Sequence, residues 1–227
     1  MKVVTDPTLE EKVYIFENRF DAGKKLARFL IDNMENDEET VVLAIPRGGV
    51  PVGVIVARKL GAAFGLIIVR KIPIPWDPEA GFGAVTSYGE PVIDKLYARS
   101  IGMSEDMVEK LVEKVKSEIK RREEIYGAYL KPVDIKGKKI IVIDDGLATG
   151  YTMLAAIKSV KSEASKVIVA IPTASKSAIK LVSQEADQVF CLNVRSGIPY
   201  FAVADAYIEW RDLTDEDVIS ILKGFSD

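Results

Sequence analysis

The sequence of 227 residues contains no histidine and only one cysteine, Cys191. Without histidine, the chain cannot use an imidazole as a metal ligand, as a general base or as the partner of a nucleophilic serine or cysteine. Catalysis on zinc is disfavoured for the same reason. A single cysteine excludes an internal disulfide, which fits a reducing compartment. The chemistry of any site must therefore come from other residue types.

Long apolar runs and an excess of basic charge are also missing. No apolar run approaches the length of about 18 residues that a membrane span needs. Residues 1–12 are too acidic and too interrupted for a signal peptide. The net charge of -3 and the pI near 5.3 give no general bias toward nucleic acid or an anionic membrane. We therefore expect a cytoplasmic protein that binds neither a membrane nor nucleic acid.

Buried strands and amphipathic helices alternate along the chain. Apolar segments without polar alternation predict strands at residues 41–45, 65–71, 139–143, 166–171 and 188–194. Periodic apolar residues and capping signals predict helices at residues 19–34, 50–60, 104–126, 151–163, 176–186 and 215–223. Strands of this kind, each followed by a helix, indicate an α/β fold with a doubly wound parallel sheet.

The length favours one domain over residues 1–227. Residues 72–94, rich in proline and glycine, read as a long loop with room for a hairpin. In open parallel sheets, ligands bind at the carboxyl ends of the strands. The loops that begin at Pro46, Lys71 and Asp144 follow such ends, so we expect them to converge on one site.

The stretch KIIVIDDGLATGYT, residues 139–152, runs from an apolar strand into two aspartates and a small, flexible loop. One aspartate could cap the following helix, but that reading does not explain two. Small residues let backbone N–H groups point at an anion, and the helix from Tyr151 adds its positive end. Thr149 and Thr152 add hydroxyl donors. The stretch indicates a phosphate cradle beside carboxylates, which suit a ligand that also carries hydroxyls or a cation.

This stretch resembles the 5-phosphoribosyl-1-pyrophosphate (PRPP) binding motif of type I phosphoribosyltransferases, except that the family usually has a bulky apolar residue in place of Gly146. AIPRGGVPVGVIVARKLGA, residues 44–62, resembles the pyrophosphate loop of the family and the helix after it. Lys71 matches a basic residue that often reaches the pyrophosphate, although it could equally be an ordinary lysine at a strand end. The resemblance covers a core of about residues 20–193.

The resemblance implies a Mg²⁺-dependent transfer of the phosphoribosyl group of PRPP to a nitrogenous base, with release of pyrophosphate. Asp144 and Asp145 would hold the ribose hydroxyls and the metal, and their charge would stabilise an oxocarbenium-like transition state. The implied catalytic residues are Asp144, Asp145, Arg47 and Lys71. The implied pyrophosphate site is Arg47, Gly48, Gly49 and Lys71, with a non-proline cis peptide between Pro46 and Arg47. The implied 5-phosphate site is Gly146, Leu147, Ala148, Thr149, Gly150, Tyr151 and Thr152.

The acceptor would bind under a hood formed mainly by residues 194–227. The segment GIPYFAVADAYIEWRDL, residues 197–213, resembles the 6-oxopurine phosphoribosyltransferases, in which a phenylalanine stacks on the purine. Phe201 or Tyr200 is the matching ring, and Lys176 resembles a lysine that contacts the purine 6-oxygen. Ala148 departs from this pattern, because those enzymes have an aspartate there, and the loop looks more like that of adenine phosphoribosyltransferase.

Purely structural roles are equally compatible with these acceptor-side residues. The aromatic residues, with Tyr207 and Trp210 as weaker candidates, could simply cover the edge of the sheet. Lys176 could be a surface residue at the start of a helix.

Residues 72–130 would be a lid and a helical insertion. Residues 73–90, with Trp76, suit a mobile lid that excludes water, but an ordered connection or an oligomer contact is an alternative. The helical part, 95–130, resembles a group of predicted bacterial and archaeal phosphoribosyltransferases, and this resemblance does not identify the substrate.

The first hypothesis is the enzyme, with a purine as the expected acceptor. The alternatives are a non-catalytic regulatory protein that senses PRPP or a nucleotide, and an inactive relative. Family members commonly dimerise, so a homodimer is expected.

Overall fold

A parallel sheet forms the centre of the molecule. The computed structural model describes residues 2–35, 39–196 and 200–226. Six parallel strands follow the order β1-β9-β8-β7-β2-β3. Their bounds are β1 Val3–Thr5, β2 Thr40–Ala44, β3 Ala63–Leu66, β7 Lys139–Ile143, β8 Lys166–Ser175 and β9 Gln188–Arg195. The predicted fold class, a doubly wound parallel α/β sheet, is confirmed.

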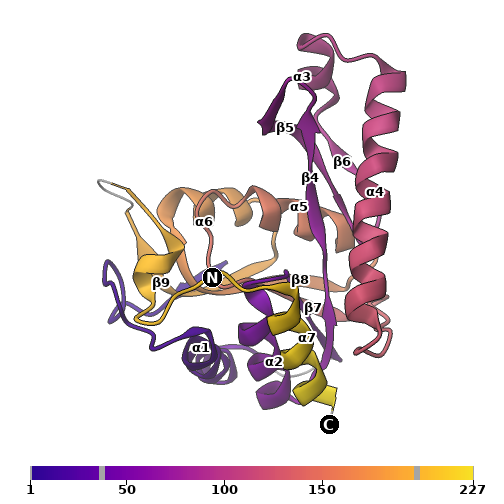
Figure 1. Cartoon of the computed structure of the whole chain (residues 1–227). Coiled ribbons are helices and arrows are strands. Elements are labelled where there is room, and N and C mark those ends of the chain that lie inside the picture. Colours follow the sequence, from indigo (N-terminus) through magenta and orange to yellow (C-terminus); the bar gives the residue numbers. More distant parts are fainter. Residues whose placement is uncertain (1, 36–38, 197–199, 227) are drawn as a thin grey trace.

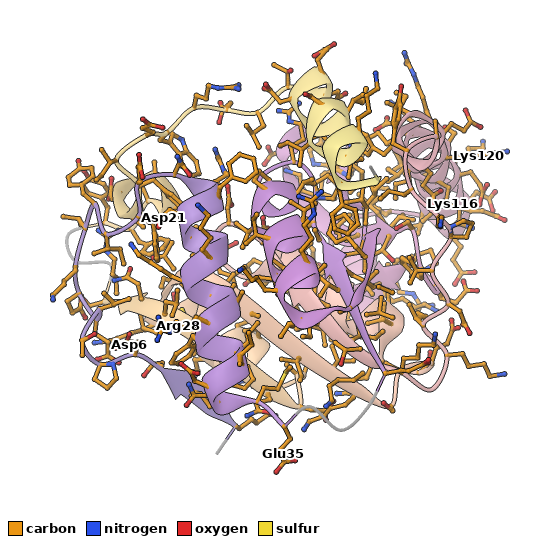
Figure 2. All side chains as sticks on the ribbon, turned by 90° about the horizontal axis from the view of Figure 1, so that it is seen from below. Asp6, Asp21, Arg28, Glu35, Lys116 and Lys120 are labelled. Atoms are coloured by element: carbon orange, nitrogen blue, oxygen red, sulfur yellow. The ribbon has the colours of Figure 1, made fainter. Side chains whose placement is uncertain are left out.

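Helices cover both faces of this sheet (Figure 1). One face carries α1 Arg19–Asn33, α2 Gly49–Leu60 and α7 Asp215–Ser226, and the other carries α5 Tyr151–Val160 and α6 Lys176–Val182. Alternate strand residues serve the two layers: Val42 and Ile141 belong to the core of the first face, Val41 and Ile140 to that of the second. Figure 2 shows the first face from below, with the charged side chain of Arg28 on the outer surface of α1.

The predicted signals at the end of α2 and the start of α4 Glu105–Gly127 are confirmed, whereas α5 and α6 end earlier than the predicted 163 and 186. The Asn18 side chain accepts hydrogen bonds from the amides of Phe20 and Asp21 at the start of α1. Gly61 ends α2 in the left-handed conformation, with φ 63°. Ser104 caps α4, as expected. Among the described residues, none of the helices is both long enough and apolar enough to cross a membrane.

A second, smaller sheet rises from the side of the molecule and corrects the sequence prediction (Figure 1). Its strands, in the antiparallel order β4-β5-β6, are β4 Val69–Ile74, β5 Asp77–Thr86 and β6 Val92–Ile93. Helices α3 Lys95–Ser100 and α4 accompany it, and α4 packs along β4 and β5. We call β4 to α4 the arm. The prediction of a long loop over residues 72–94 is therefore wrong, but the hairpin that it allowed is present as the antiparallel pair β4 and β5.

The predicted strand 65–71 is also wrong as a single element. Its first part is β3, after which the Ile67 amide donates to the Ala44 carbonyl at 2.9 Å. Ile68 then bonds to Ser87 through both its amide and its carbonyl, so the chain leaves the main sheet and enters the arm. An apolar run does not reveal to which of two sheets it belongs, because burial in either sheet produces the same pattern.

Candidate functional site

The carboxyl ends of β2 and β7 lie side by side and bring two of the predicted loops into contact. The strands pair at Ala44 and Ile143, and the Ile45 amide donates to the Ile143 carbonyl at 2.8 Å. Gly48 lies directly against Asp145, because a Cβ atom at Gly48 would collide with the Asp145 carboxylate. The structure thus joins the loop after β2 to the acidic pair after β7.

Asp145 is fixed by an arginine that no sequence motif marks. Nε of Arg19, at the start of α1, donates to Asp145 Oδ2 at 2.7 Å, and the two side chains are only 8% and 13% exposed. The Arg19 guanidinium also donates to the Arg211 carbonyl at 2.9 Å and lies 3.8 Å from the centroid of the Trp210 ring. Burial raises the pKa of Asp145, and the charge of Arg19 opposes that shift. One carboxylate oxygen of Asp145 is therefore already occupied.

Asp144 is in a different situation from its neighbour. Its Oδ1 accepts the Asp145 amide at 2.8 Å, and its side chain is partly exposed. Burial and the adjacent charge of Asp145 raise the pKa of Asp144. Within the described part of the chain, no lysine or arginine lies within ion-pair distance of Asp144. Asp144 is therefore the carboxylate of the pair that is more open to a ligand.

The loop after the acidic pair is anchored to β8 by its backbone. The Leu147 amide donates to the Thr173 carbonyl and the Leu147 carbonyl accepts the Ser175 amide, both at 3.0 Å. Ser175 Oγ donates to the Ala148 carbonyl at 2.7 Å. The Leu147 amide is thus used within the protein and is not available to a phosphate.

The second half of this loop leaves a row of amides without acceptors. Gly150 has φ 83°, a conformation that favours glycine, and it precedes α5 without a side-chain cap. Among the described residues, the amides of residues 148–153 donate no hydrogen bond. Thr149 and Thr152 are exposed beside them. This geometry suits an anion, and the assignment of residues 146–152 to a 5-phosphate stays a prediction.

The structure explains why this chain has glycine at position 146. A Cβ atom there would stand 2.5 Å from Val203 Cγ1 and 3.0 Å from Thr173 Cγ2. Val203 belongs to a short 3₁₀ helix, Val203–Ala206, in the predicted hood. The departure from the family pattern at Gly146 therefore makes room for the hood segment.

The loop after β2 has the predicted backbone. The peptide bond between Pro46 and Arg47 is cis, which confirms that expectation. The Gly49 amide donates to the Ile45 carbonyl at 3.0 Å, so of the two glycine amides assigned to pyrophosphate only that of Gly48 has no acceptor among the described residues. Nη1 of Arg47 lies 3.7 Å from Oδ1 of Asp215, at the start of α7.

Lys71, the fourth predicted pyrophosphate residue, lies on the arm rather than on the main sheet. It is exposed within β4, opposite Ala84 of β5. Its aliphatic stem covers Gly81, where a Cβ atom would collide with it. Its role at the pyrophosphate stays a prediction.

The acceptor-side candidates lie near the carboxyl ends of β8 and β9. Lys176 Nζ pairs with Glu11 Oε1 at 2.9 Å on the surface, and this bond is the main cause that lowers the pKa of Glu11 to about 2. The ring of Phe201 is partly buried, with the Arg195 guanidinium 5.2 Å from its centroid. Tyr200 is 67% exposed. The base-binding roles of Lys176, Tyr200 and Phe201 stay predictions.

The weaker aromatic candidates have structural contacts instead. Tyr207 is buried, and its hydroxyl donates to the backbone carbonyl of Asp145 at 2.6 Å. Trp210 stacks on Arg19. Residues 197–199 of the predicted acceptor segment lie outside the described residues.

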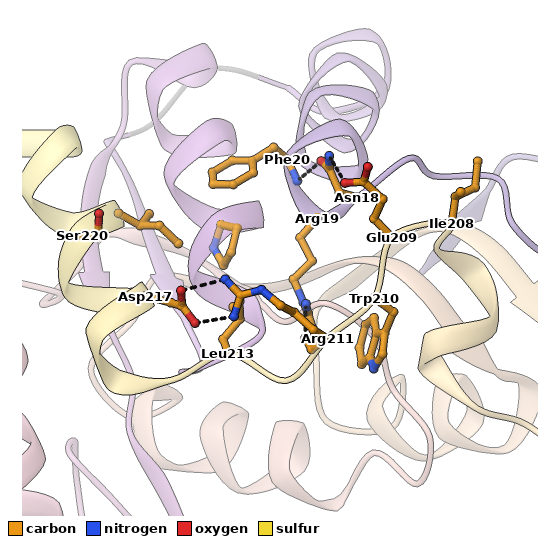
Figure 3. A pocket seen from close by; sticks show the side chains of 12 residues that line it. Asn18, Arg19, Phe20, Ile208, Glu209, Trp210, Arg211, Leu213, Asp217 and Ser220 are labelled. Atoms are coloured by element: carbon orange, nitrogen blue, oxygen red, sulfur yellow. Dashed lines mark hydrogen bonds and ion pairs between the residues drawn. The ribbon is translucent and has the colours of Figure 1, made fainter.

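A cleft of about 590 Å³ opens on the α1 side of the acidic pair (Figure 3). It is lined by Asn18, Arg19, Phe20, Pro51, Ile208, Glu209, Trp210, Arg211, Leu213, Asp217, Ser220 and Ile221. Figure 3 shows Arg211 and Asp217 joined by two hydrogen bonds, of 2.6 and 2.7 Å, at one end of it. Of the predicted acceptor-side residues, only the weaker candidate Trp210 is among the described residues that line this cleft, and Arg19 connects the cleft to the acidic pair.

Comparison with known proteins identifies relatives along most of the chain. The family model of the phosphoribosyl transferase domain matches residues 11–204. The chain is 32% identical over 209 residues to "Putative phosphoribosyl transferase Rv0571c" of Mycobacterium tuberculosis H37Rv, covering 92% of this chain and 46% of that protein. The chain therefore spans about half the length of the curated relatives that it matches.

Solved structures agree in fold. TT1426 from Thermus thermophilus is 34% identical, with a TM-score of 0.79, and the match covers 92% of this chain and 98% of that one. A hypothetical protein from Neisseria gonorrhoeae, solved with bound ppGpp, is 13% identical with a TM-score of 0.51, and the match covers 95% of this chain and 97% of that one. The second likeness concerns the fold alone.

Proposed function

Because the chain belongs to the phosphoribosyl transferase domain family, we propose that it transfers the 5-phosphoribosyl group of PRPP to a nitrogenous base, a purine, and releases pyrophosphate. The observation that carries the proposal is the contact between Gly48 of the loop after β2 and the carboxylate of Asp145. This contact puts a loop suited to pyrophosphate, a carboxylate pair and an uncapped helix start at one edge of the sheet. PRPP carries a diphosphate, two hydroxyls and a phosphate in the same succession.

In the proposed reaction, the bond between the anomeric carbon and the pyrophosphate oxygen breaks, and a base nitrogen forms the new bond to that carbon and gives up its proton to the released pyrophosphate. The bonding electrons leave with pyrophosphate, and the ribose ring carries positive charge in between. Carboxylates placed beforehand near that charge stabilise it. Asp144 is the better placed of the two for a direct contact, because Arg19 occupies one oxygen of Asp145. The amides of residues 148–153 would receive the 5-phosphate.

The residues present fit Mg²⁺ as an ion that arrives with the substrate. Mg²⁺ prefers oxygen ligands, keeps several waters and binds through one or two carboxylates together with substrate phosphates. The described residues contain no cluster of three or more acidic, cysteine or histidine side chains that could hold an ion on its own. Asp144 and, with its remaining oxygen, Asp145 would hold the ion. When bound, it would neutralise charge on the leaving pyrophosphate.

A non-catalytic sensor of PRPP or a nucleotide is the second candidate function. The ion pair between Arg19 and Asp145 favours it, because an occupied carboxylate interacts less with a charged transition state. Both candidates bind the same ligand at the same loops, and only turnover separates them.

The test is a screen for base-dependent pyrophosphate release from PRPP with MgCl₂, with purines, pyrimidines and small amines as acceptors. Release with a purine, and a nucleotide detected by mass spectrometry, is expected. If calorimetry shows PRPP binding but no acceptor causes release of pyrophosphate, the sensor remains as the candidate function. Absence of PRPP binding would remove both candidates. The cytoplasmic location and the homodimer stay predictions, and sedimentation checks the latter.

The matched variant is Asp144→Asn, because the amide oxygen can still accept the Asp145 N–H while the charge is lost. Turnover should fall by at least about 100-fold, as for loss of one preorganised electrostatic contact in a transition state. The control is Asp134→Asn, an exposed carboxylate that accepts the Lys136 amide at 3.0 Å in the same manner, away from the site. Equal turnover in both variants would contradict the role of Asp144.

A further inference from the structure

One hydrogen bond and one ion pair link the arm to the loop after β2. The hydroxyl of Tyr126, in the last turn of α4, donates to Asp215 Oδ1 at 2.6 Å. The same carboxylate oxygen lies 3.7 Å from Nη1 of Arg47. The three residues come from three distant parts of the sequence: the helical insertion, the start of α7 and the loop that follows β2. In the proposed reaction, the helical insertion has no role.

Tyr126 is a rigid support in this chain. Its side chain is 1% exposed and belongs to the core that the arm shares with the first face of the main sheet. Burial and the Asp215 carboxylate raise the pKa of Tyr126, so its hydroxyl remains a donor at neutral pH. The bond from Tyr126 lowers the pKa of Asp215, which stays ionised. The carboxylate is therefore held in one place by a group that cannot move far.

Arg47 is held more loosely and retains free capacity. Its side chain is 40% exposed, and among the described residues its ion pair is the one long contact to Asp215 through one nitrogen. A guanidinium carries five N–H donors in a fixed fork, so the remaining donors can bind a second anion at the same time. Asp215 can thus support Arg47 while Arg47 contacts a phosphate.

A second arginine on α4 balances the charge of this support. Arg122 precedes Tyr126 by four residues, so both side chains lie on one face of the helix. The positive charges of Arg122 and Arg47 both act on Asp215. With two cations around one carboxylate, Asp215 does not make the surroundings of Arg47 repulsive to an incoming anion.

We propose that Tyr126 and Asp215 are positioning residues for Arg47, and that the arm thereby sets the affinity of the site for the pyrophosphate group. The inference rests on the proposed function, because it takes the loop after β2 as the pyrophosphate site. It gives the helical insertion a role. Tyr126 of α4 fixes the Asp215 carboxylate, and this carboxylate orients Arg47. Neither positioning residue contacts the substrate.

The experiment measures two ligands by calorimetry in MgCl₂ with full-length variants. Inorganic pyrophosphate tests the Arg47 side, and ribose 5-phosphate tests the acidic pair and the loop before α5. Asp215→Asn should weaken pyrophosphate binding about tenfold, as expected when a charged partner of a binding group is lost. Tyr126→Phe removes only the hydroxyl and should weaken it about threefold, as for the loss of one hydrogen bond. Ribose 5-phosphate affinity should not change in either variant.

Matched controls separate positioning from stability. Asp217→Asn changes the same first turn of α7, but Asp217 pairs with Arg211 instead of Arg47. Tyr97→Phe removes an exposed hydroxyl on α3 of the arm. Both controls should bind pyrophosphate as the parent does.

Unchanged pyrophosphate affinity in Asp215→Asn overturns the inference. Tighter binding also overturns it, because Asp215 would then compete with the ligand for Arg47. A parallel loss of both ligands indicates a damaged fold and counts against a positioning role. If the parent protein binds neither ligand, the proposed function fails. If the parent binds both ligands and the variants bind them equally well, only the inference about Tyr126 and Asp215 fails.

Discussion

The sugar-phosphate side and the acceptor side of the site are built in opposite ways. On the sugar-phosphate side, Asp145 is buried, paired with Arg19 and pressed against Gly48. On the acceptor side, Lys176 is held by a surface ion pair with Glu11, and Tyr200 projects into solvent. A buried, packed geometry permits one arrangement, whereas exposed pairs are easily rearranged. The difference fits a site in which one substrate is fixed and the other is selected by a variable hood.

Among the predicted changes, removal of the Arg19 guanidinium on the sugar-phosphate side should have the largest effect on the stability of the protein. Arg19→Gln leaves the buried Asp145 carboxylate without its partner, which should lower the free energy of unfolding by about 3–5 kcal/mol. Urea denaturation measures the change. Arg28→Gln is the matched control on the same helix, because Arg28 and Asp32 form an exposed pair at 4.0 Å, and it should cost less than about 0.5 kcal/mol. Similar losses in both variants would mean that Arg19 does not support the acidic pair.

The packing of the hood against the phosphate loop comes next in size. Gly146→Ala puts a methyl group 2.5 Å from Val203, so the free energy of unfolding should fall by about 1–3 kcal/mol, as for overpacking. Val203→Ala in the same chain should restore part of the loss, and a double-mutant cycle measures the coupling. Gly127→Ala is the control, because no atom outside the adjacent residues and the backbone of its own helix lies within 4 Å of the added Cβ. Additive effects of the two changes would show that loop and hood are independent.

A smaller effect is expected on the acceptor side. Phe201→Ala removes a ring that rests against Arg195, so the KM for the base should rise about tenfold while the KM for PRPP stays constant. Steady-state kinetics with both substrates varied measures this. Tyr200→Ala changes the neighbouring exposed ring, and the KM for the base in this variant should stay within about twofold of the parent value. A larger effect of Tyr200→Ala would exchange the roles of the two rings.

The smallest expected effect is the loss of stability at low pH from the Lys176–Glu11 pair on the acceptor side. The Lys176 and Ser196 hydrogen bonds lower the pKa of Glu11 from 4.5 to about 2. A carboxyl group whose pKa is lowered by folding adds stability above its unfolded pKa, and this stability is lost as the pH falls from about 4.5 toward 2. Carbon-13 NMR of the Glu11 side chain should therefore show a midpoint near 2, and Lys176→Met should raise it. A midpoint near 4.5 in the parent would mean that the Lys176–Glu11 pair does not form in solution.

Much of the main sheet and of the phosphate loop could be predicted from local sequence. The segment from Lys139 to Thr152 reads as strand, carboxylate pair, loop and helix start, and the structure has those elements in that order. Strand patterns, capping residues and left-handed glycines act over a few residues, so a short stretch contains the information. The prolines of the arm gave the opposite signal. They favoured a loop, although the strands β4 and β5 accommodate Pro73 at a shift in register.

Local sequence was enough for the order of strands and helices in the main sheet, for the small loop after Asp145 and, through a motif resemblance, for the cis peptide at Arg47. The residues that hold the site in place became visible only in the folded chain. Arg19 lies 126 residues from its partner Asp145, and Tyr126 lies 89 residues from Asp215. Such pairs leave no periodic or local trace, because a charge or a hydroxyl on the surface of an isolated helix looks the same whether or not folding buries it against a distant partner.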